Sequence, residues 1–267
     1  MKVAVVSING ERTAKTVLAC TMANVYPVAT GGRESVYITN KSLGEVLDIM
    51  EFSSEEVAIE KSIEVLTGLA VTNSISDSDI TDYAYLPIRQ PKAMYFDAFS
   101  EIIPQWEAYE KCMSVLNKLG NRFMVMDISG KLEDHTVAEF MEEANVVLLT
   151  FRPDRRQVKQ VKDYMSSLTD EEKLKVKLVC VAYDDRGISK KSILKLLGLK
   201  RPKSILWIPY NLIAEQQTFE GTLCNFINGV AVGDPACLNM RQPIKDLLSA
   251  IMDVPETKVI KEVNAWQ

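Results

Sequence analysis

The sequence predicts an α/β protein in which helices cover both faces of a doubly wound, mainly parallel sheet, in three layers. Short apolar runs alternate with longer amphipathic segments along almost the whole chain. The apolar runs are nearly continuous, which is typical of strands buried on both faces of a parallel sheet. Strand–helix–strand crossovers are right-handed, so a doubly wound sheet is the natural solution. Because 267 residues contain no low-complexity linker, we expect a single domain spanning residues 1–267.

Strands and helices are expected in alternation. The apolar runs predict strands at residues 3–8, 35–39, 83–86, 122–126 (ending at Asp127), 145–151, 176–182 and 204–208. Helical spacing predicts helices at residues 16–26, 55–69, 97–119, 137–143, 154–168 and 190–197. The remainder after the last strand is expected to be mostly helical, most clearly at 244–252. Pro27 is expected to end the first helix, and the Ser- and Asp-rich stretch 72–82 is expected to be a surface loop.

Composition favours a cytoplasmic protein. The net charge is −5, which argues against a chain-wide nucleic-acid coat, and the five cysteines include no C-x-x-C pair, which favours a reducing compartment. The sequence has neither a signal-peptide pattern nor an apolar run of membrane-spanning length, so we expect any membrane contact to be peripheral.

One loop carries a candidate site. The first predicted strand runs into Asn9-Gly10-Glu11-Arg12-Thr13-Ala14-Lys15-Thr16, and a helix follows. Lys15 and Thr16 match the phosphate-binding pattern G-x-x-x-x-G-K-[ST], whereas Asn9 and Ala14 replace its two glycines. In such loops the lysine binds phosphate, the hydroxyl binds Mg²⁺ and backbone N–H groups enclose the phosphates. The alternative is a plain strand–turn–helix junction that binds nothing, and the motif alone does not separate the two.

Beyond this loop, the chain resembles the ParA/MinD family of deviant phosphate-loop ATPases over its whole length. Residues 122–130, with Asp127 after an apolar strand, resemble the family's second-motif strand. Residues 143–153 resemble its next strand, and residues 207–211 resemble its late Ile-Pro-Tyr segment near the nucleotide base. The resemblance implies a P-loop NTPase-like fold that binds ATP or ADP with Mg²⁺.

The resemblance also implies the roles of the site residues. Residues 9–16 would contact the nucleotide together with Pro209, Tyr210 and Asn211. Thr16 and Asp127 would hold Mg²⁺, and Asp127 would be the catalytic residue. The alternative role for Asp127 is a turn or helix cap at the end of a strand.

Three departures from the family pattern predict altered chemistry. Gly10 stands where the family has a signature lysine that reaches the partner's phosphates in a dimer. The strand at 35–39 ends without a carboxylate, and residues 181–184 lack a base-recognition asparagine. Since loss of a cation at developing negative charge commonly costs a few kcal/mol, we expect weak or altered nucleotide binding and slow or absent hydrolysis.

The resemblance implies a homodimer that positions or helps to assemble a larger machine, such as a pilus, secretion or conjugation apparatus, as TadZ/CpaE-like members do. Components of that machine would be its partners, and they would recruit it to the inner face of the membrane or to a cell pole. One alternative is an active ParA-type ATPase that binds DNA non-specifically in plasmid or chromosome partition. Another is a nucleotide-free interaction module that keeps only the fold.

Two basic segments bear on these alternatives. The segment from Arg186 to Lys203 carries seven lysines and arginines and no acidic residue, and a second stripe runs from Arg152 to Lys162. We favour solvated helix faces over a DNA-binding surface, because the chain is acidic and few aromatic residues interleave. The weakly amphipathic residues 257–267 are expected to pack on the protein and not on a membrane.

Overall fold

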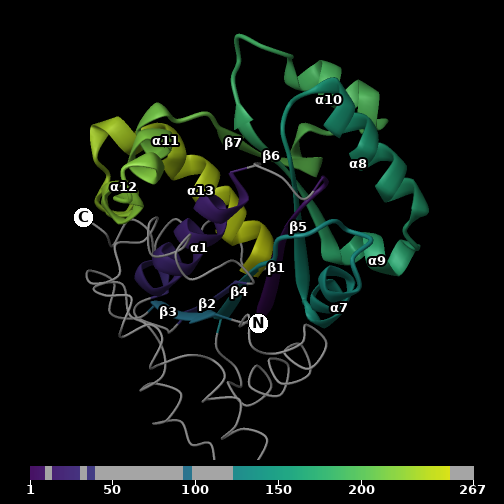
Figure 1. Cartoon of the computed structure of the whole chain (residues 1–267). Helices are drawn as coiled ribbons and strands as arrows, with labels where there is room; N and C mark the ends of the chain where they lie inside the picture. The colour runs from purple at the N-terminus through teal and green to yellow at the C-terminus, as the bar shows by residue number, and fades with distance from the viewer. Residues whose placement is uncertain (10–13, 31–34, 40–92, 98–122, 253–267) are drawn as a thin grey trace, which may run out of the picture.

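A computed structural model describes residues 1–9, 14–30, 35–39, 93–97 and 123–252 (Figure 1). The strands are β1 (Lys2–Ser7), β2 (Ser35–Thr39), β3 (Ala93–Asp97), β4 (Phe123–Asp127), β5 (Val146–Phe151), β6 (Val176–Tyr183) and β7 (Ile205–Pro209). The helices are α1 (Lys15–Ala29), α7 (His135–Glu143), α8 (Arg155–Ser167), α9 (Asp170–Lys175), α10 (Lys190–Leu197), α11 (Leu212–Phe219), α12 (Leu223–Val232) and α13 (Leu238–Met252). Two short 3-10 helices, Pro202–Ser204 and Pro235–Cys237, complete the described elements.

The described strands form one parallel sheet in the order β3-β2-β4-β1-β5-β6-β7. Helices α1, α11, α12 and α13 cover one face, and α7, α8 and α10 cover the other (Figure 1). Alternate residues of β1 serve the two cores: Val3 and Val5 face the first set of helices, and Ala4 and Val6 face the second. This two-sided burial explains the continuous apolar runs and confirms the predicted three-layer α/β/α fold.

The sheet register brings the candidate site together. Asp127, the last residue of β4, is paired with Val5 of β1 on one side and with Thr39 of β2 on the other. β1 lies in the middle of the sheet, and the chain crosses over it between β4 and β5. Ligands of doubly wound sheets bind outside the carboxyl ends of the strands at such a switch point.

The prediction that Pro27 ends the first helix was wrong. Helix α1 continues through Pro27 to Ala29. A proline within a helix leaves the carbonyl four residues earlier without its usual N–H partner. Here that carbonyl belongs to Ala23, and the buried hydroxyl of Ser35 donates a hydrogen bond to it. A tertiary contact from β2 therefore compensates for the proline.

Strand β3 and helix α9 were not predicted. Strand β3 ends at Asp97, where the sequence predicted the start of a helix. The short helix α9 begins with a capping box in which Thr169 and Glu172 bond each other's backbone N–H groups. The predicted elements at 55–69 and 83–86, the loop at 72–82, the rest of the helix at 97–119, and residues 257–267 lie outside the described residues. Within the part of the chain that is described, no helix combines the length and apolarity needed to cross a bilayer.

Candidate nucleotide site

The strand–loop–helix junction lies at the carboxyl edge of the sheet. β1 ends at the buried Ser7, and α1 begins at Lys15. Ala14, immediately before the helix, has φ 53° and ψ 21°, which is the left-handed conformation. This conformation costs a non-glycine residue about 1 kcal/mol, which is why the phosphate-loop pattern has glycine at this position. The predicted contacts at Gly10, Glu11, Arg12 and Thr13 lie outside the described residues.

Lys15 makes the central contact of the site. Its Nζ lies 3.0 Å from Asp127 Oδ1, and the two side chains are 7% and 0% exposed. The same ammonium donates hydrogen bonds to the carbonyl oxygen of Ile128 at 2.6 Å and to Ser129 Oγ at 3.0 Å. Within the described part of the chain, Asp127 Oδ1 accepts no hydrogen bond of good geometry, so charge alone holds this oxygen to Lys15.

β2 fixes the other side of Asp127. The Tyr37 hydroxyl donates a hydrogen bond to Asp127 Oδ2 at 2.8 Å, and Thr39 Oγ1 donates to the Asp127 carbonyl oxygen at 2.9 Å. Burial raises the pKa of the Tyr37 phenol well above its usual value near 10.0, and the Asp127 charge raises it further. Tyr37 is therefore a neutral donor at physiological pH.

These contacts limit how a Mg²⁺ ion fits. Thr16 lies in the first turn of α1 and is buried, and the phosphate-loop pattern has its metal-binding hydroxyl at this place in the sequence. Asp127 is on the adjacent strand end, but Lys15 and Tyr37 hold its two oxygens. A metal bound directly through Asp127 would therefore have to share a carboxylate oxygen with one of these partners or displace it, whereas a metal bound through water would not.

An apolar cavity of about 380 Å³ lies beside the loop. Ala14, Val17 and Thr21 line it from the side of α1, and Pro209, Tyr210 and Asn211 line it from the end of β7. Arg152, which follows β5, also lines the cavity and is exposed to solvent. The volume lies within the range of small-molecule sites, and the mixture of apolar walls and a few polar groups is typical of them.

Structural contacts hold two of the predicted base-bordering residues. The Tyr210 hydroxyl donates to the carboxylate of Glu215, which raises the pKa of the phenol. Asn211 Oδ1 accepts from the backbone N–H of Ala214 and so caps α11, while its Nδ2 donates to Asn239 Oδ1 at 2.7 Å. Asn211 therefore positions the cavity wall through the start of α11.

Sequence analysis missed several residues of this site. The strand 35–39 was noted only because it ends without a carboxylate, yet Tyr37 and Thr39 of this strand hold Asp127 in place. Ser129 and Arg152 were also not predicted, although Ser129 contacts Lys15 and Arg152 lines the cavity. The available signal was a pair of hydroxyl groups two positions apart in a buried strand, since alternate strand residues share one face.

The described residues form a doubly wound α/β fold with a strand–loop–helix junction at the carboxyl edge of its sheet. No family model and no curated protein matches the sequence. Solved structures do match. A ParA family ATPase from Chlorobium tepidum has a TM-score of 0.64 at 13% identity, over 93% of this chain and 96% of that chain.

Two MinD structures are also similar. The MinC:MinD complex from Aquifex aeolicus gives a TM-score of 0.62 at 15% identity, over 93% of this chain and 96% of the other. MinD from Pyrococcus horikoshii, solved with Mg-ADP, gives 0.57 at 13% identity, over 92% of this chain and 96% of the other. The fold of this chain is therefore the ParA/MinD-like fold, as its sequence predicted.

Proposed function

We propose that this protein is a ParA/MinD-like nucleotide-binding protein that positions or helps to assemble a larger machine and hydrolyses nucleotide slowly or not at all. The observation that carries the proposal is the buried Lys15–Asp127 pair at the carboxyl edge of the sheet, beside the 380 Å³ cavity. A cation at the start of α1 favours phosphate, and the adjacent apolar cavity suits a base.

The contacts of the site support weak binding and slow chemistry. A phosphate group reaches Lys15 only if the ammonium gives up some of its contacts to Asp127, Ile128 and Ser129. Asp127 is itself held by Tyr37, which opposes a role in activating water. Gly10 supplies no charge where the resembling family has its lysine. Each contact must be exchanged when a nucleotide binds, and the exchange subtracts from its affinity.

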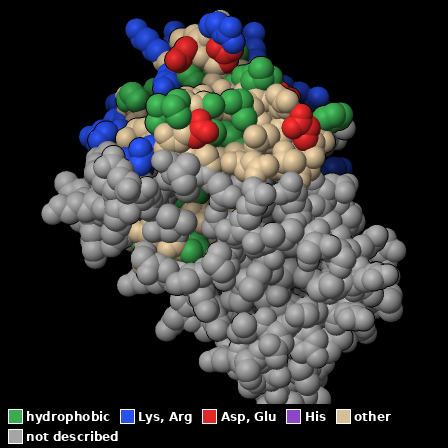
Figure 2. Space-filling model, turned by 90° about the vertical axis from the view of Figure 1, so that its left-hand side faces the viewer, with side chains coloured by type: hydrophobic (Ala, Val, Ile, Leu, Met, Phe, Trp, Pro, Cys, Tyr) green, Lys and Arg blue, Asp and Glu red, His purple; other side chains and the backbone are tan. Residues whose placement is uncertain are grey.

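An exposed apolar surface beside the cavity supports an assembly role. Phe219 and Leu212 lie seven residues apart on α11 and are 92% and 65% exposed. Figure 2 looks onto the side of α11 and α12, where hydrophobic side chains gather among few acidic ones. Exposed apolar surface of this kind favours contact with a second copy or a partner protein.

Nucleotide binding is tested by thermal or urea unfolding with and without Mg-ATP or Mg-ADP. A ligand at a hundredfold over its dissociation constant stabilises the folded state by about 2.7 kcal/mol. We expect a smaller stabilisation at millimolar nucleotide, and none in Thr16→Val with Lys15 intact. If the wild-type protein shows no stabilisation even when the nucleotide concentration is raised tenfold above millimolar, the nucleotide-free interaction module replaces this proposal.

A second candidate function, non-specific DNA binding, is favoured by one tertiary relationship. Helices α8 and α10 lie side by side and pack against each other (Figure 1), and both carry exposed basic side chains. This basic face consists of Arg152, Arg155, Arg156, Lys159, Lys162, Arg186, Lys190, Lys191, Lys195, Lys200, Arg201 and Lys203, all exposed. Together the two segments offer DNA more positive charge than either segment does alone. Contacts between these charges and DNA phosphates would give an affinity that depends on salt.

The two functions are separated by binding to random duplex DNA at several salt concentrations. If the basic face binds DNA, Lys191→Glu with Lys195→Glu weakens binding and lowers the salt slope by about 2. Lys131→Glu, an exposed lysine before α7, is the matched control and leaves that slope unchanged. If the protein does not bind DNA even at low salt, only the assembly function remains as a candidate.

A further inference from the structure

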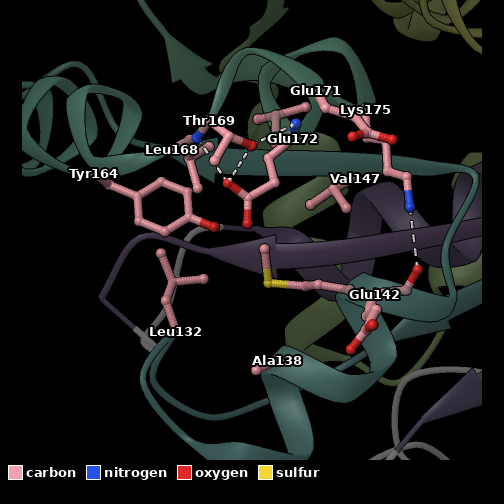
Figure 3. A pocket seen from close by; sticks show the side chains of 12 residues that line it. Leu132, Ala138, Glu142, Val147, Tyr164, Leu168, Thr169, Glu171, Glu172 and Lys175 are labelled. Carbon is pink, nitrogen blue, oxygen red and sulfur yellow. Dashed lines mark hydrogen bonds between the residues drawn. The ribbon is translucent and has the colours of Figure 1, made fainter.

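A second cavity, of about 570 Å³, lies between α7 and α8 and away from the nucleotide site (Figure 3). Val147 and Val176 line it at the starts of β5 and β6, so it lies toward the amino ends of these strands. Lys15 and Asp127 lie at the opposite, carboxyl edge of the sheet. Occupation of the two cavities is therefore sterically independent.

The lining of this cavity is about half apolar and half polar. Leu132 and Ala138 come from the α7 side, Leu168 follows α8, and Met141 completes the lining from α7. Tyr164 contributes its half-buried ring from α8. A cavity of this volume with an apolar part of its lining is within the range that binds small organic molecules.

Two polar groups line one side of the cavity, the half-buried Tyr164 and the solvent-exposed Glu172. Figure 3 shows the Glu172 carboxylate and the Tyr164 hydroxyl directed toward the same region. Glu172 Oε2 is held by the Thr169 N–H at 2.7 Å and by Thr169 Oγ1 at 2.8 Å. These bonds lower the pKa of Glu172 below 4.5, so the carboxylate is charged at neutral pH. Burial, and then the charge of Glu172, raise the pKa of Tyr164, which is therefore neutral.

The lysines of α9 direct their charge elsewhere. Lys175 Nζ donates to the carbonyl oxygen of Glu142 at 3.3 Å, at the far end of the cavity in Figure 3. Lys173 Nζ pairs with Asp170 at 3.4 Å. The cavity lining includes three carboxylates, from Glu142, Glu171 and Glu172, and one ammonium group, from Lys175. The lining therefore has a net negative charge.

We propose that the α7–α8 cavity binds a small organic cation, an ammonium group on an apolar stem, with the stem between Met141 and Leu168 and the ammonium at Glu172 and Tyr164. The fixed carboxylate gives the site charge complementarity for a cation, and the apolar floor gives the stem a surface to bury. A neutral ligand of the same shape gains only the second contribution, and an anion is repelled.

The proposal is tested with three probes that share one apolar body: 4-phenylbutylamine, 4-phenylbutan-1-ol and 4-phenylbutyrate. Binding is followed by the ¹³C-methyl resonance of Met141, assigned with Met141→Leu in the full chain. We expect the amine to shift this resonance saturably, the alcohol to bind at least tenfold more weakly, and the carboxylate not to bind.

Two variants locate the binding. Glu172→Gln keeps a side chain that can complete the capping box, and it should bring the affinity of the amine down to that of the alcohol. Ala138→Leu narrows the cavity and should weaken binding of both. Glu220→Gln, after α11 on the other face of the sheet, is the control and should change neither.

The proposal is overturned if the amine and the alcohol bind equally well. It is also overturned if the amine gives no saturable shift of the Met141 resonance, even at 20 times the concentration used for the alcohol. Binding of a lysine-containing amphipathic peptide without binding of the free amine also overturns it, because the cavity then serves a protein partner. Nucleotide binding at Lys15 is not expected to change in any of these variants, so failure here is distinct from failure of the proposed function.

Discussion

Lys15 Nζ lies 3.0 Å from Asp127 Oδ1, and both side chains are buried at the carboxyl edge of the sheet. The two residues are far apart in the sequence, and parallel pairing of β1 with β4 brings them together. The pair contributes to both the stability of the site and its ligand chemistry, because a buried charge is tolerated only with a partner.

Removing one member of this pair is expected to destabilise the protein strongly. Lys15→Met leaves the Asp127 charge buried without its cation, which should lower the free energy of unfolding by about 3 kcal/mol or more. Lys15→Met with Asp127→Asn removes both charges and should recover part of the loss. Urea unfolding of the wild type, Lys15→Met, Asp127→Asn and the double variant gives the coupling energy, and additive losses would show that the two charges do not interact.

Tyr37 predicts a pH dependence of stability. Its folded-state pKa is raised above the unfolded value near 10, so the folded state keeps a proton that the unfolded state loses. The contribution is fully present below pH 10 and declines as the pH rises from there toward the folded-state pKa. Tyr37→Phe should cost about 2 kcal/mol at pH 7 and should flatten this decline. Unfolding at pH 7 to 11 measures the difference, and parallel curves for both proteins would contradict it.

Ser35 and Pro27 are expected to be coupled. Ser35→Ala leaves the Ala23 carbonyl buried without a donor, which should cost about 2 kcal/mol. In Pro27→Ala the helix supplies its own N–H to that carbonyl, so Ser35→Ala should cost much less in this background. Chemical denaturation of the double-mutant cycle measures the coupling, and equal costs in both backgrounds would argue against the compensation.

Ala14→Gly should stabilise the loop and improve nucleotide binding. Glycine adopts the left-handed conformation of residue 14 without strain, so the free energy of unfolding should rise by up to about 1 kcal/mol. The same substitution at Ala138, an exposed residue within α7, is the control and should destabilise by about 1 kcal/mol. Titration with Mg-ADP then tests affinity, and a loss of affinity in Ala14→Gly would contradict the phosphate-loop role.

Phe219 is expected to contribute to self-association and little to stability. Because the side chain is 92% exposed, Phe219→Ser should change unfolding by less than about 0.5 kcal/mol. If a homodimer uses the α11 surface, the variant should shift sedimentation toward monomer. Leu174, on α9, is also a large apolar residue and is 77% exposed. Leu174→Ser is therefore the control and should leave sedimentation unchanged. An unaltered dimer in Phe219→Ser would remove this surface from the interface.

Most strands and helices could be predicted from sequence because apolar periodicity depends on which side chains are buried. The strand 35–39 and the helix 190–197 have the bounds that their patterns predicted. Strand β3 and helix α9 were not predicted. Helix α9 has no buried residue, so its short acidic run carries no apolar stripe that could indicate a helix. Pro27 was misread because the donor that replaces its lost hydrogen bond comes from β2.

The sequence by itself determined the three-layer parallel sheet and the position of Lys15 at a strand–loop–helix junction, since both follow from local patterns of burial and spacing. The tertiary structure decided what Lys15 and Asp127 contact, that Tyr37 and Thr39 hold Asp127, and that helices α8 and α10 pack against each other. These relationships depend on strand order and register, which join residues far apart in the chain and leave no local pattern to read.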